Sequence, residues 1–93
     1  MSVEWSPAKA IANLAKHGVD FADAATALHD EGALTRVDPD SSGEDRFVSL
    51  AMDARGRVLV IVFTLREDVV RIVSSRRASR GERRTYERFR DAR

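Results

Sequence analysis

The stretch RVLVIVFTLREDVVRIVSSRR, residues 57–77, decides the fold of this 93-residue chain. Its first half is almost wholly apolar and rich in valine, isoleucine and phenylalanine, which is typical of a central strand buried on both faces. Glu67 and Asp68 then offer a two-residue turn, and residues 69–77 return as a second strand. The stretch therefore predicts an antiparallel hairpin at the centre of a sheet.

The hairpin also predicts a register. If Glu67 and Asp68 are the turn residues, Arg66 pairs with Val69, and residues paired in this way share a sheet face. One face then has the character of a core: Ile61, Phe63, Leu65, Val70, Ile72 and Ser74. The other face is polar and basic: Val62, Thr64, Arg66, Arg71, Val73, Ser75 and Arg77. A register change of one residue would exchange the two faces.

Two helices are predicted before the hairpin, and we expect both to cover one face of the sheet. Ser6 suits the N-cap and Pro7 the first turn of a helix that ends at Gly18. Asp20 can cap a second helix over residues 21–30. The apolar positions of the first helix fall at helical spacing on one face: Ala8, Ile11, Ala12 and Ala15.

The remaining elements complete an α+β domain that spans residues 1–93. Short strands are expected at 3–5, 33–37 and 46–52. Ser79 and Glu82 have the spacing of a capping box at the start of the last helix, in which Tyr86 and Phe89 are the main apolar anchors. The resulting order, β-α-α-β-β-β-β-α, predicts a mostly antiparallel sheet with two N-terminal helices and one C-terminal helix.

The composition excludes several classes of protein. Apolar residues make up 43% and charged residues 33% of the chain, which is a globular balance and not that of a disordered chain. There is no cysteine, and the two histidines lie too far apart to form a zinc signature. No apolar run reaches the length of a membrane span, and the N-terminus does not have the pattern of a signal peptide. We therefore expect a cytoplasmic protein without a membrane, metal or cofactor.

The charge of the chain is divided along its length. Residues 1–70 hold seven basic and twelve acidic residues, whereas residues 71–93 hold nine arginines and three acids, so the net charges are −5 and +6. Arginine suits bidentate contact with phosphate or carboxylate. The basic end therefore predicts a nucleic acid or an acidic protein as partner. A solvated, ion-paired helix face is the alternative.

Two sets of residues, one near the start of the chain and one in its second half, follow fixed patterns. The pattern E-W-x-P-x-K-x-x-x-N-x-x-K-H-G is matched by Glu4, Trp5, Pro7, Lys9, Asn13, Lys16, His17 and Gly18. The later pattern, around G-R, T-x-R and R-I-I-S-A-R, is matched by Gly56, Arg57, Thr64, Arg66, Arg71, Ile72, Ser74, Arg76, Glu82 and Tyr86. Together with the segment EDRF, residues 44–47, these sets resemble the BrnT family of bacterial type II toxins over residues 3–87. The chain departs from the family at Asp40-Ser41, in the loop before this segment, where relatives often have His-Ser.

The resemblance implies a RelE-like ribonuclease fold and a toxin that cleaves RNA and arrests translation. It also implies a cognate antitoxin, with a ribbon-helix-helix region, that neutralises the toxin and represses the shared operon. Operator DNA would then be contacted through the antitoxin alone. RNA can be cleaved without a metal when the adjacent 2′-hydroxyl is the nucleophile and the protein stabilises charge on the phosphate oxygens.

Arginines can supply this charge stabilisation, because their donors match phosphate geometry. Arg66, Arg71 and Arg76 are the best candidates for contact with the reacting phosphate, with a structural ion pair as the alternative for each. Tyr86 is a further catalytic candidate and equally a candidate core anchor. The expected outer contacts to RNA or antitoxin are Arg77, Arg80, Arg83 and Arg84, and His17 is either an RNA contact or a cation at a helix C-terminus.

A second hypothesis is a module that binds without catalysis. In this interpretation, the arginine-rich C-terminal region engages nucleic acid or an acidic protein and cleaves nothing. An RNA cleavage assay in the presence of a chelator separates the two hypotheses.

Overall fold

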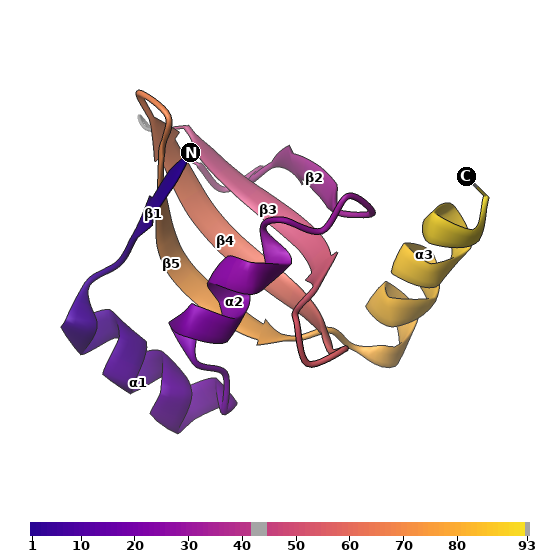
Figure 1. Ribbon diagram of the computed structural model, residues 1–93, viewed down its shortest axis with the longest axis horizontal. Helices are drawn as coiled ribbons and strands as arrows, with labels where there is room; N and C mark the ends of the chain where they lie inside the picture. Colours follow the sequence, from indigo (N-terminus) through magenta and orange to yellow (C-terminus); the bar gives the residue numbers. More distant parts are fainter. Residues whose placement is uncertain (42–44, 93) are drawn as a thin grey trace.

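The structure, a computed structural model, describes residues 1–41 and 45–92. A five-stranded sheet has the strand order β1-β5-β4-β3-β2, in which β1 is parallel to β5 and the other neighbours are antiparallel (Figure 1). The α+β class and the mostly antiparallel sheet are therefore confirmed. In chain order the elements are β1 (Ser2–Glu4), α1 (Pro7–His17), α2 (Phe21–Ala27), β2 (Leu34–Val37), β3 (Arg46–Met52), β4 (Val58–Arg66), β5 (Val69–Arg77) and α3 (Arg80–Asp91).

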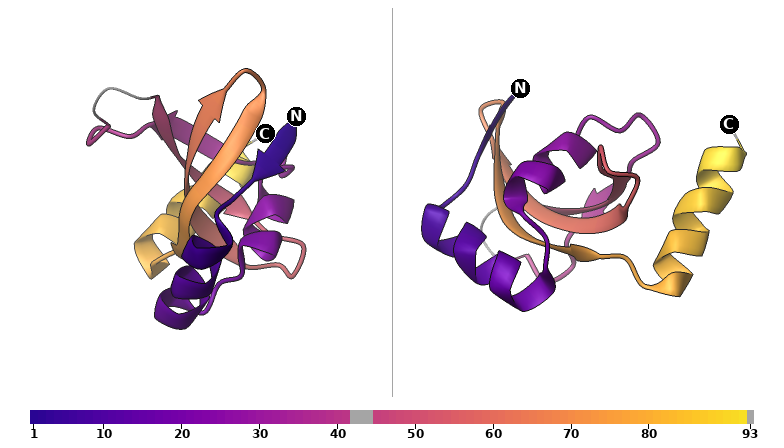
Figure 2. Two further views of the ribbon diagram at one scale, coloured as in Figure 1. Left: turned by 90° about the vertical axis from the view of Figure 1, so that its left-hand side faces the viewer. Right: turned by 60° about the horizontal axis from the view of Figure 1, so that its bottom comes forward.

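The core lies between the sheet and its two N-terminal helices. Phe21 and Ala24 of α2 pack with Leu59 and Ile61 of β4, and all four side chains are fully buried. The C-terminal helix α3 does not join this layer but extends away from the far end of β5 (Figure 2). The sheet face opposite α1 and α2, which is formed by β2–β5, is therefore bordered by the first turns of α3. Within the described residues, no helix has the length and apolar character that crossing a membrane requires.

The predicted hairpin is confirmed near its turn. Glu67 and Asp68 have φ angles of 50° and 66°, the left-handed pair that a type I′ turn requires. Arg66 pairs with Val69, and Phe63 with Ile72, as the sequence predicts. Further along, the register shifts by one residue, because Val62 pairs with Ser74. Val73 is therefore the extra residue of a β-bulge.

The bulge overturns the predicted faces for the second half of β5. Ser75 pairs with Ile61 and is 1% exposed, so it lies on the core face where Ser74 was expected. Arg76 pairs with Val60 and joins the face of Arg71, whereas Arg77 pairs with Leu59 on the other face. The physical reason is the period of two along a strand, in which one extra residue reverses every later side chain.

The predicted orientation of α1 is also wrong. Ile11, on the expected core face, is 72% exposed, and Asn13 is the buried residue of the helix. The Asn13 amide donates to the carbonyls of Ser75 at 2.8 Å and Val19 at 3.0 Å, and its oxygen accepts from the Ser75 N–H at 3.1 Å. β1 pairs with β5 up to Arg71, so Asn13 satisfies backbone groups that a neighbouring strand would otherwise bond.

Local signals predict the helix ends well. The Ser6 and Asp20 caps are present, Gly18 has φ of 69°, and the capping box of Ser79 and Glu82 is complete. The helix expected over 21–30 is shorter, because α2 ends at Ala27.

Two residues of the later BrnT pattern, Gly56 and Arg57, serve the turn between β3 and β4. Gly56 has φ of 81°. Arg57 bonds the buried Asp53 carboxylate at 2.9 Å and Asp23 of α2 at 3.1 Å. This turn is thereby tied to α2.

Candidate nucleic-acid interface

Cross-strand pairs gather arginines on the sheet face opposite α1 and α2. Arg46 of β3 pairs with Thr64, which pairs with Arg71. Arg36 of β2 pairs with Val48, which lies two positions after Arg46 in β3. Because paired residues share a face, these rows lie on one surface together with Arg66 and Arg76. We call this surface the arginine face and define it as Arg36, Arg46, Arg66, Arg71 and Arg76.

Sequence patterns do not reveal Arg36 and Arg46 as members of this face. Arg36 lies in a short strand, and Arg46 begins another, so local patterns give neither residue a partner. The missing information was the strand order β5-β4-β3-β2, which is set by contacts between segments far apart in the chain. Arg46 had one signal, since it lies in the segment EDRF, residues 44–47, that resembles the family.

Arg66 and Arg71 meet at one end of the arginine face. Both line a pocket of about 250 Å³ near the hairpin turn, together with Thr64 and Glu4. The parallel pairing of β1 sets Glu4 beside Arg71, and their side chains form an ion pair at 3.2 Å. Both side chains are about half exposed, so this pair is weak and leaves Arg71 able to exchange Glu4 for a phosphate.

Arg76 lies further along β5 and is held by Glu82 of α3. Two guanidinium nitrogens donate to the two carboxylate oxygens at 2.8 and 2.9 Å, and the Ser79 N–H donates to the same carboxylate at 2.8 Å. The hydrogen bonds from Arg76 are the main reason that the pKa of Glu82 is lowered from 4.5 to about 2, and the pair raises the pKa of Arg76. At neutral pH Glu82 is a carboxylate that orients Arg76, and its low pKa makes it a poor general base.

Tyr86 does not reach the arginine face. Its side chain is 1% exposed, and its hydroxyl donates to Asp30 at 2.5 Å. The Asp30 carboxylate also accepts from the N–H groups of Met52 and Gly32, both at 2.8 Å. This network joins α3 to the loop between α2 and β2 and to the end of β3, which is the anchor role considered from the sequence.

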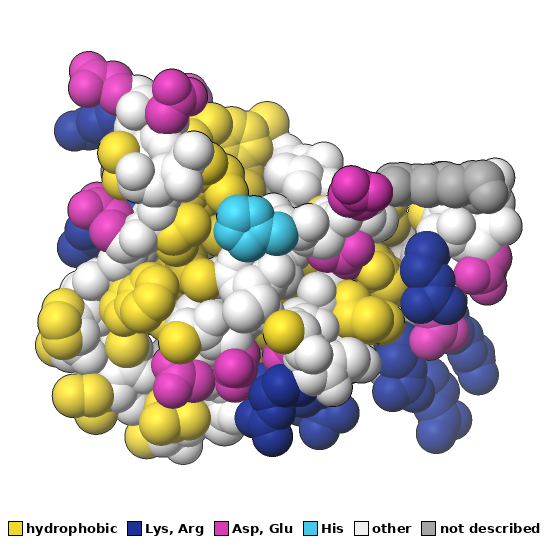
Figure 3. All heavy atoms as spheres, viewed as in Figure 1, with side chains coloured by type: hydrophobic (Ala, Val, Ile, Leu, Met, Phe, Trp, Pro, Cys, Tyr) yellow, Lys and Arg dark blue, Asp and Glu magenta, His cyan; other side chains and the backbone are white. Residues whose placement is uncertain are grey.

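The outer candidates fall into separate groups. Arg80, Arg83 and Arg84 are exposed on α3. His17 lies in a depression between α1 and β5, which it shares with Lys9, Lys16 and Ser74. Arg77 lies on the opposite face of β5 from Arg76. Figure 3 shows basic side chains gathered near α3, whereas apolar side chains cover the surface around α1.

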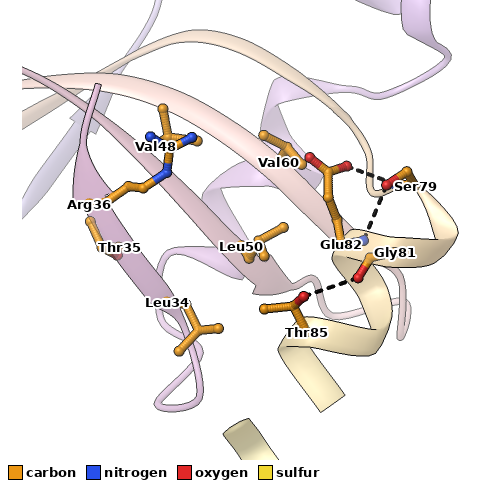
Figure 4. Close-up of a pocket in the computed structure, with 10 residues that line it drawn as sticks. All are labelled: Leu34, Thr35, Arg36, Val48, Leu50, Val60, Ser79, Gly81, Glu82 and Thr85. Atoms are coloured by element: carbon orange, nitrogen blue, oxygen red, sulfur yellow. Dashed lines mark hydrogen bonds between the residues drawn. The ribbon is translucent and has the colours of Figure 1, made fainter. Parts of the chain in front are cut away.

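A groove runs between the arginine face and α3. It encloses about 590 Å³, and its floor is made by side chains of β2, β3 and β4. Thr85 and Glu82 project from α3 toward Leu50 and Val60 across the groove (Figure 4). The full lining is Leu34, Thr35, Arg36, Val48, Leu50, Val60, Ser79, Gly81, Glu82 and Thr85. Across residues 1–41 and 45–92, we found no cluster of histidine and acidic side chains that could hold a metal ion.

The chain thus folds as a small α+β domain that gathers arginines on one face of its sheet. The chain belongs to the BrnT family, the ribonuclease toxins of type II toxin–antitoxin systems, whose family model matches residues 5–82. A solved structure similar to this chain is that of the ribonuclease toxin BrnT of Brucella abortus, with 25% sequence identity and a TM-score of 0.63. The match covers 86% of this chain and 99% of that chain. A search of curated proteins gave no match.

Proposed function

We propose that this ribonuclease toxin holds RNA phosphates on the arginine face and cleaves the chain without a metal ion. The observation that carries the proposal is the placement of Arg71 and Arg76 on one face by the bulge at Val73. Arg76 is already oriented by Glu82, so little reorganisation is needed when a phosphate arrives. Oriented donors of this kind stabilise charge in a transition state better than flexible ones.

The reaction that fits this surface is attack by a ribose 2′-oxygen on the adjacent phosphorus. The bond from phosphorus to the 5′-oxygen of the next nucleotide breaks, which leaves a 2′,3′-cyclic phosphate and a 5′-hydroxyl. The 2′-hydroxyl gives up its proton, and the departing 5′-oxygen takes one up. Negative charge increases on the non-bridging oxygens during the attack, and the guanidinium groups of Arg66, Arg71 and Arg76 stabilise it.

Outer contacts extend this site along the RNA. We assign these contacts to the exposed arginines Arg77, Arg80, Arg83 and Arg84 and to His17. Tyr86 is left out of the reacting groups, because its hydroxyl is buried and bonded to Asp30. Arg36 and Arg46 join the proposed RNA surface because they share the arginine face.

The same proposal covers the effect of the toxin in the cell and its control by the antitoxin. Cleavage of RNA in the cytoplasm would arrest translation, and the cognate antitoxin would prevent it. A ribbon-helix-helix region on the antitoxin would bind the operator, so that the toxin contacts DNA through the antitoxin alone. The family supports an antitoxin and RNA as partners, which favours an enzyme over the alternative of a module that binds without cleavage.

The test is an RNA cleavage assay with purified toxin in the presence of a chelator. We expect cleavage to continue, with 2′,3′-cyclic phosphate ends on the products. Loss of cleavage on chelation, restored by added metal, would refute the metal-free reaction. Tight RNA binding with no cleavage under any condition would instead support the binding module.

A further inference from the structure

The floor of the groove beside α3 is aliphatic and partly open to solvent. Leu34, Val48 and Leu50 are half-buried, and Val60 is 6% exposed at the base. α3 is held to the rest of the molecule by the Arg76–Glu82 ion pair and by the Tyr86–Asp30 hydrogen bond. An apolar floor that the chain itself leaves open is typical of a surface that a partner covers.

The chemistry of the lining favours a protein side chain over an RNA base. Proteins hold single-stranded bases mainly by stacking them on aromatic rings. Among the described residues, no aromatic side chain lines the groove. Aliphatic floors of this kind are instead filled by apolar side chains of a protein partner. RNA therefore has good contacts on the arginine face and poor ones in the groove.

The charge around the groove selects the kind of protein segment. Arg36 lines the groove itself, and Glu82, the acidic residue of the lining, is paired with Arg76. Arg80, Arg83 and Arg84 are exposed on the helix that forms the wall of the groove. A segment that lays apolar side chains on the floor would set its polar side against these cations, so acidic residues there are complementary.

We infer that the groove binds an acidic, amphipathic segment of the cognate antitoxin. The inference rests on the proposed function in one respect. A segment in the groove would pass beside Arg76 and so exclude RNA from this proposed phosphate contact. RNA and antitoxin would then compete for the arginines, whereas only the antitoxin would contact the aliphatic floor. This extra apolar contact would let the antitoxin displace bound RNA.

The experiment places a large side chain in the groove by a substitution on α3, the helix that forms its wall. Thr85 is exposed on α3, and its hydroxyl donates to the Gly81 carbonyl of the same helix, so Thr85→Trp adds an indole with little effect on the core. The matched control is Ala22→Trp, which adds the same indole on an exposed position of α2 at the opposite sheet face. Antitoxin affinity is measured by titration with purified cognate antitoxin, and RNA cleavage is measured separately without antitoxin.

We expect Thr85→Trp to weaken antitoxin binding by roughly tenfold or more, as a change at the centre of an interface does, and to leave cleavage unchanged. Ala22→Trp should change neither. Wild-type antitoxin affinity in folded Thr85→Trp would overturn the inference, and so would loss of cleavage with antitoxin binding retained. Because binding is measured without reference to activity, a toxin that cleaves no RNA would refute the proposed function and leave this result standing.

A second pair of variants tests the sign of the charge. Thr85→Glu should repel an acidic segment and Thr85→Lys should attract it, although the two side chains are similar in length. We expect antitoxin affinity to rank Lys above Glu by several-fold at low salt, with the difference shrinking as salt rises. The opposite ranking, or no difference at low salt, would show that the segment in the groove is not acidic.

Discussion

Arg76 and Glu82 join the last strand to the last helix through two parallel hydrogen bonds of 2.8 and 2.9 Å. Glu82 also closes the capping box of α3 by accepting from the Ser79 N–H. One carboxylate therefore orients a proposed phosphate contact and starts the helix that forms the wall of the groove. Its loss should affect both stability and activity.

The first prediction concerns the pH dependence of stability. The pKa of Glu82 is lowered in the folded protein from 4.5 to about 2, so the unfolded chain takes up the proton more readily. The stabilisation is present above about pH 4.5 and is lost as pH falls toward 2. Because the pair is partly exposed, we expect Glu82→Gln to lower the free energy of unfolding by roughly 0.5–1 kcal/mol at neutral pH.

Urea unfolding at a series of pH values measures this effect. The difference in free energy of unfolding between wild type and Glu82→Gln should shrink as pH falls below 4.5, while other carboxylates titrate equally in both proteins. A difference that stays constant down to pH 2 would show that the ion pair is not formed in solution.

The second prediction concerns catalysis. Arg71→Ala or Arg76→Ala should reduce RNA cleavage by about a hundred- to a thousandfold, which is the usual effect of removing a donor to a transition state. Arg55→Ala is the control, because Arg55 is an exposed arginine whose ion pair with Asp23 lies on the turn beside α2. Rates are measured on purified, folded variants. Full activity in either site variant would exclude that arginine from the reaction.

The third prediction separates an anchor from a catalyst at Tyr86. Tyr86→Phe removes the hydrogen bond to the Asp30 carboxylate, and we expect a loss of about 1.5–3 kcal/mol in the free energy of unfolding. Cleavage measured well below the melting temperature should remain close to wild type. A large loss of cleavage in a variant with unchanged stability would return Tyr86 to the reacting groups.

The fourth prediction concerns α3. Charge reversal of Arg80, Arg83 and Arg84 should weaken RNA binding far more than it lowers the melting temperature, because these side chains are exposed. RNA affinity of the wild type should fall steeply with salt as counterions are released. Excess antitoxin should abolish RNA binding, which titration at two salt concentrations would show. A stable ternary complex of toxin, antitoxin and RNA would contradict a shared surface.

Sequence predicted the parts of the fold that short-range chemistry controls. The turn at Glu67 and Asp68, the capping box at Ser79 and the helix end at Gly18 all depend on neighbouring residues, and all are present. These signals are strong because each satisfies backbone groups, or a left-handed φ, within a few positions.

The missed features depend on distant contacts. Asn13 turns inward because backbone groups of Ser75 need a partner, and nothing within α1 reveals that need. The bulge at Val73 and the membership of Arg36 in the arginine face likewise follow from the pairing of separate strands. Helical spacing could place apolar residues on one side of α1 but could not tell which side would face the sheet.

The bulge at Val73 leaves a trace that can be read in other sequences. In a regular strand, residues on one face are separated by an even number of positions, yet Arg71 and Arg76 share a face at an odd separation. A relative without the extra residue should carry its second arginine four positions after the first, and a relative with it should carry five. Arginine spacing in this strand is therefore a marker by which the geometry of the site could be followed through the family, and a single-residue deletion here should be tolerated less than most substitutions.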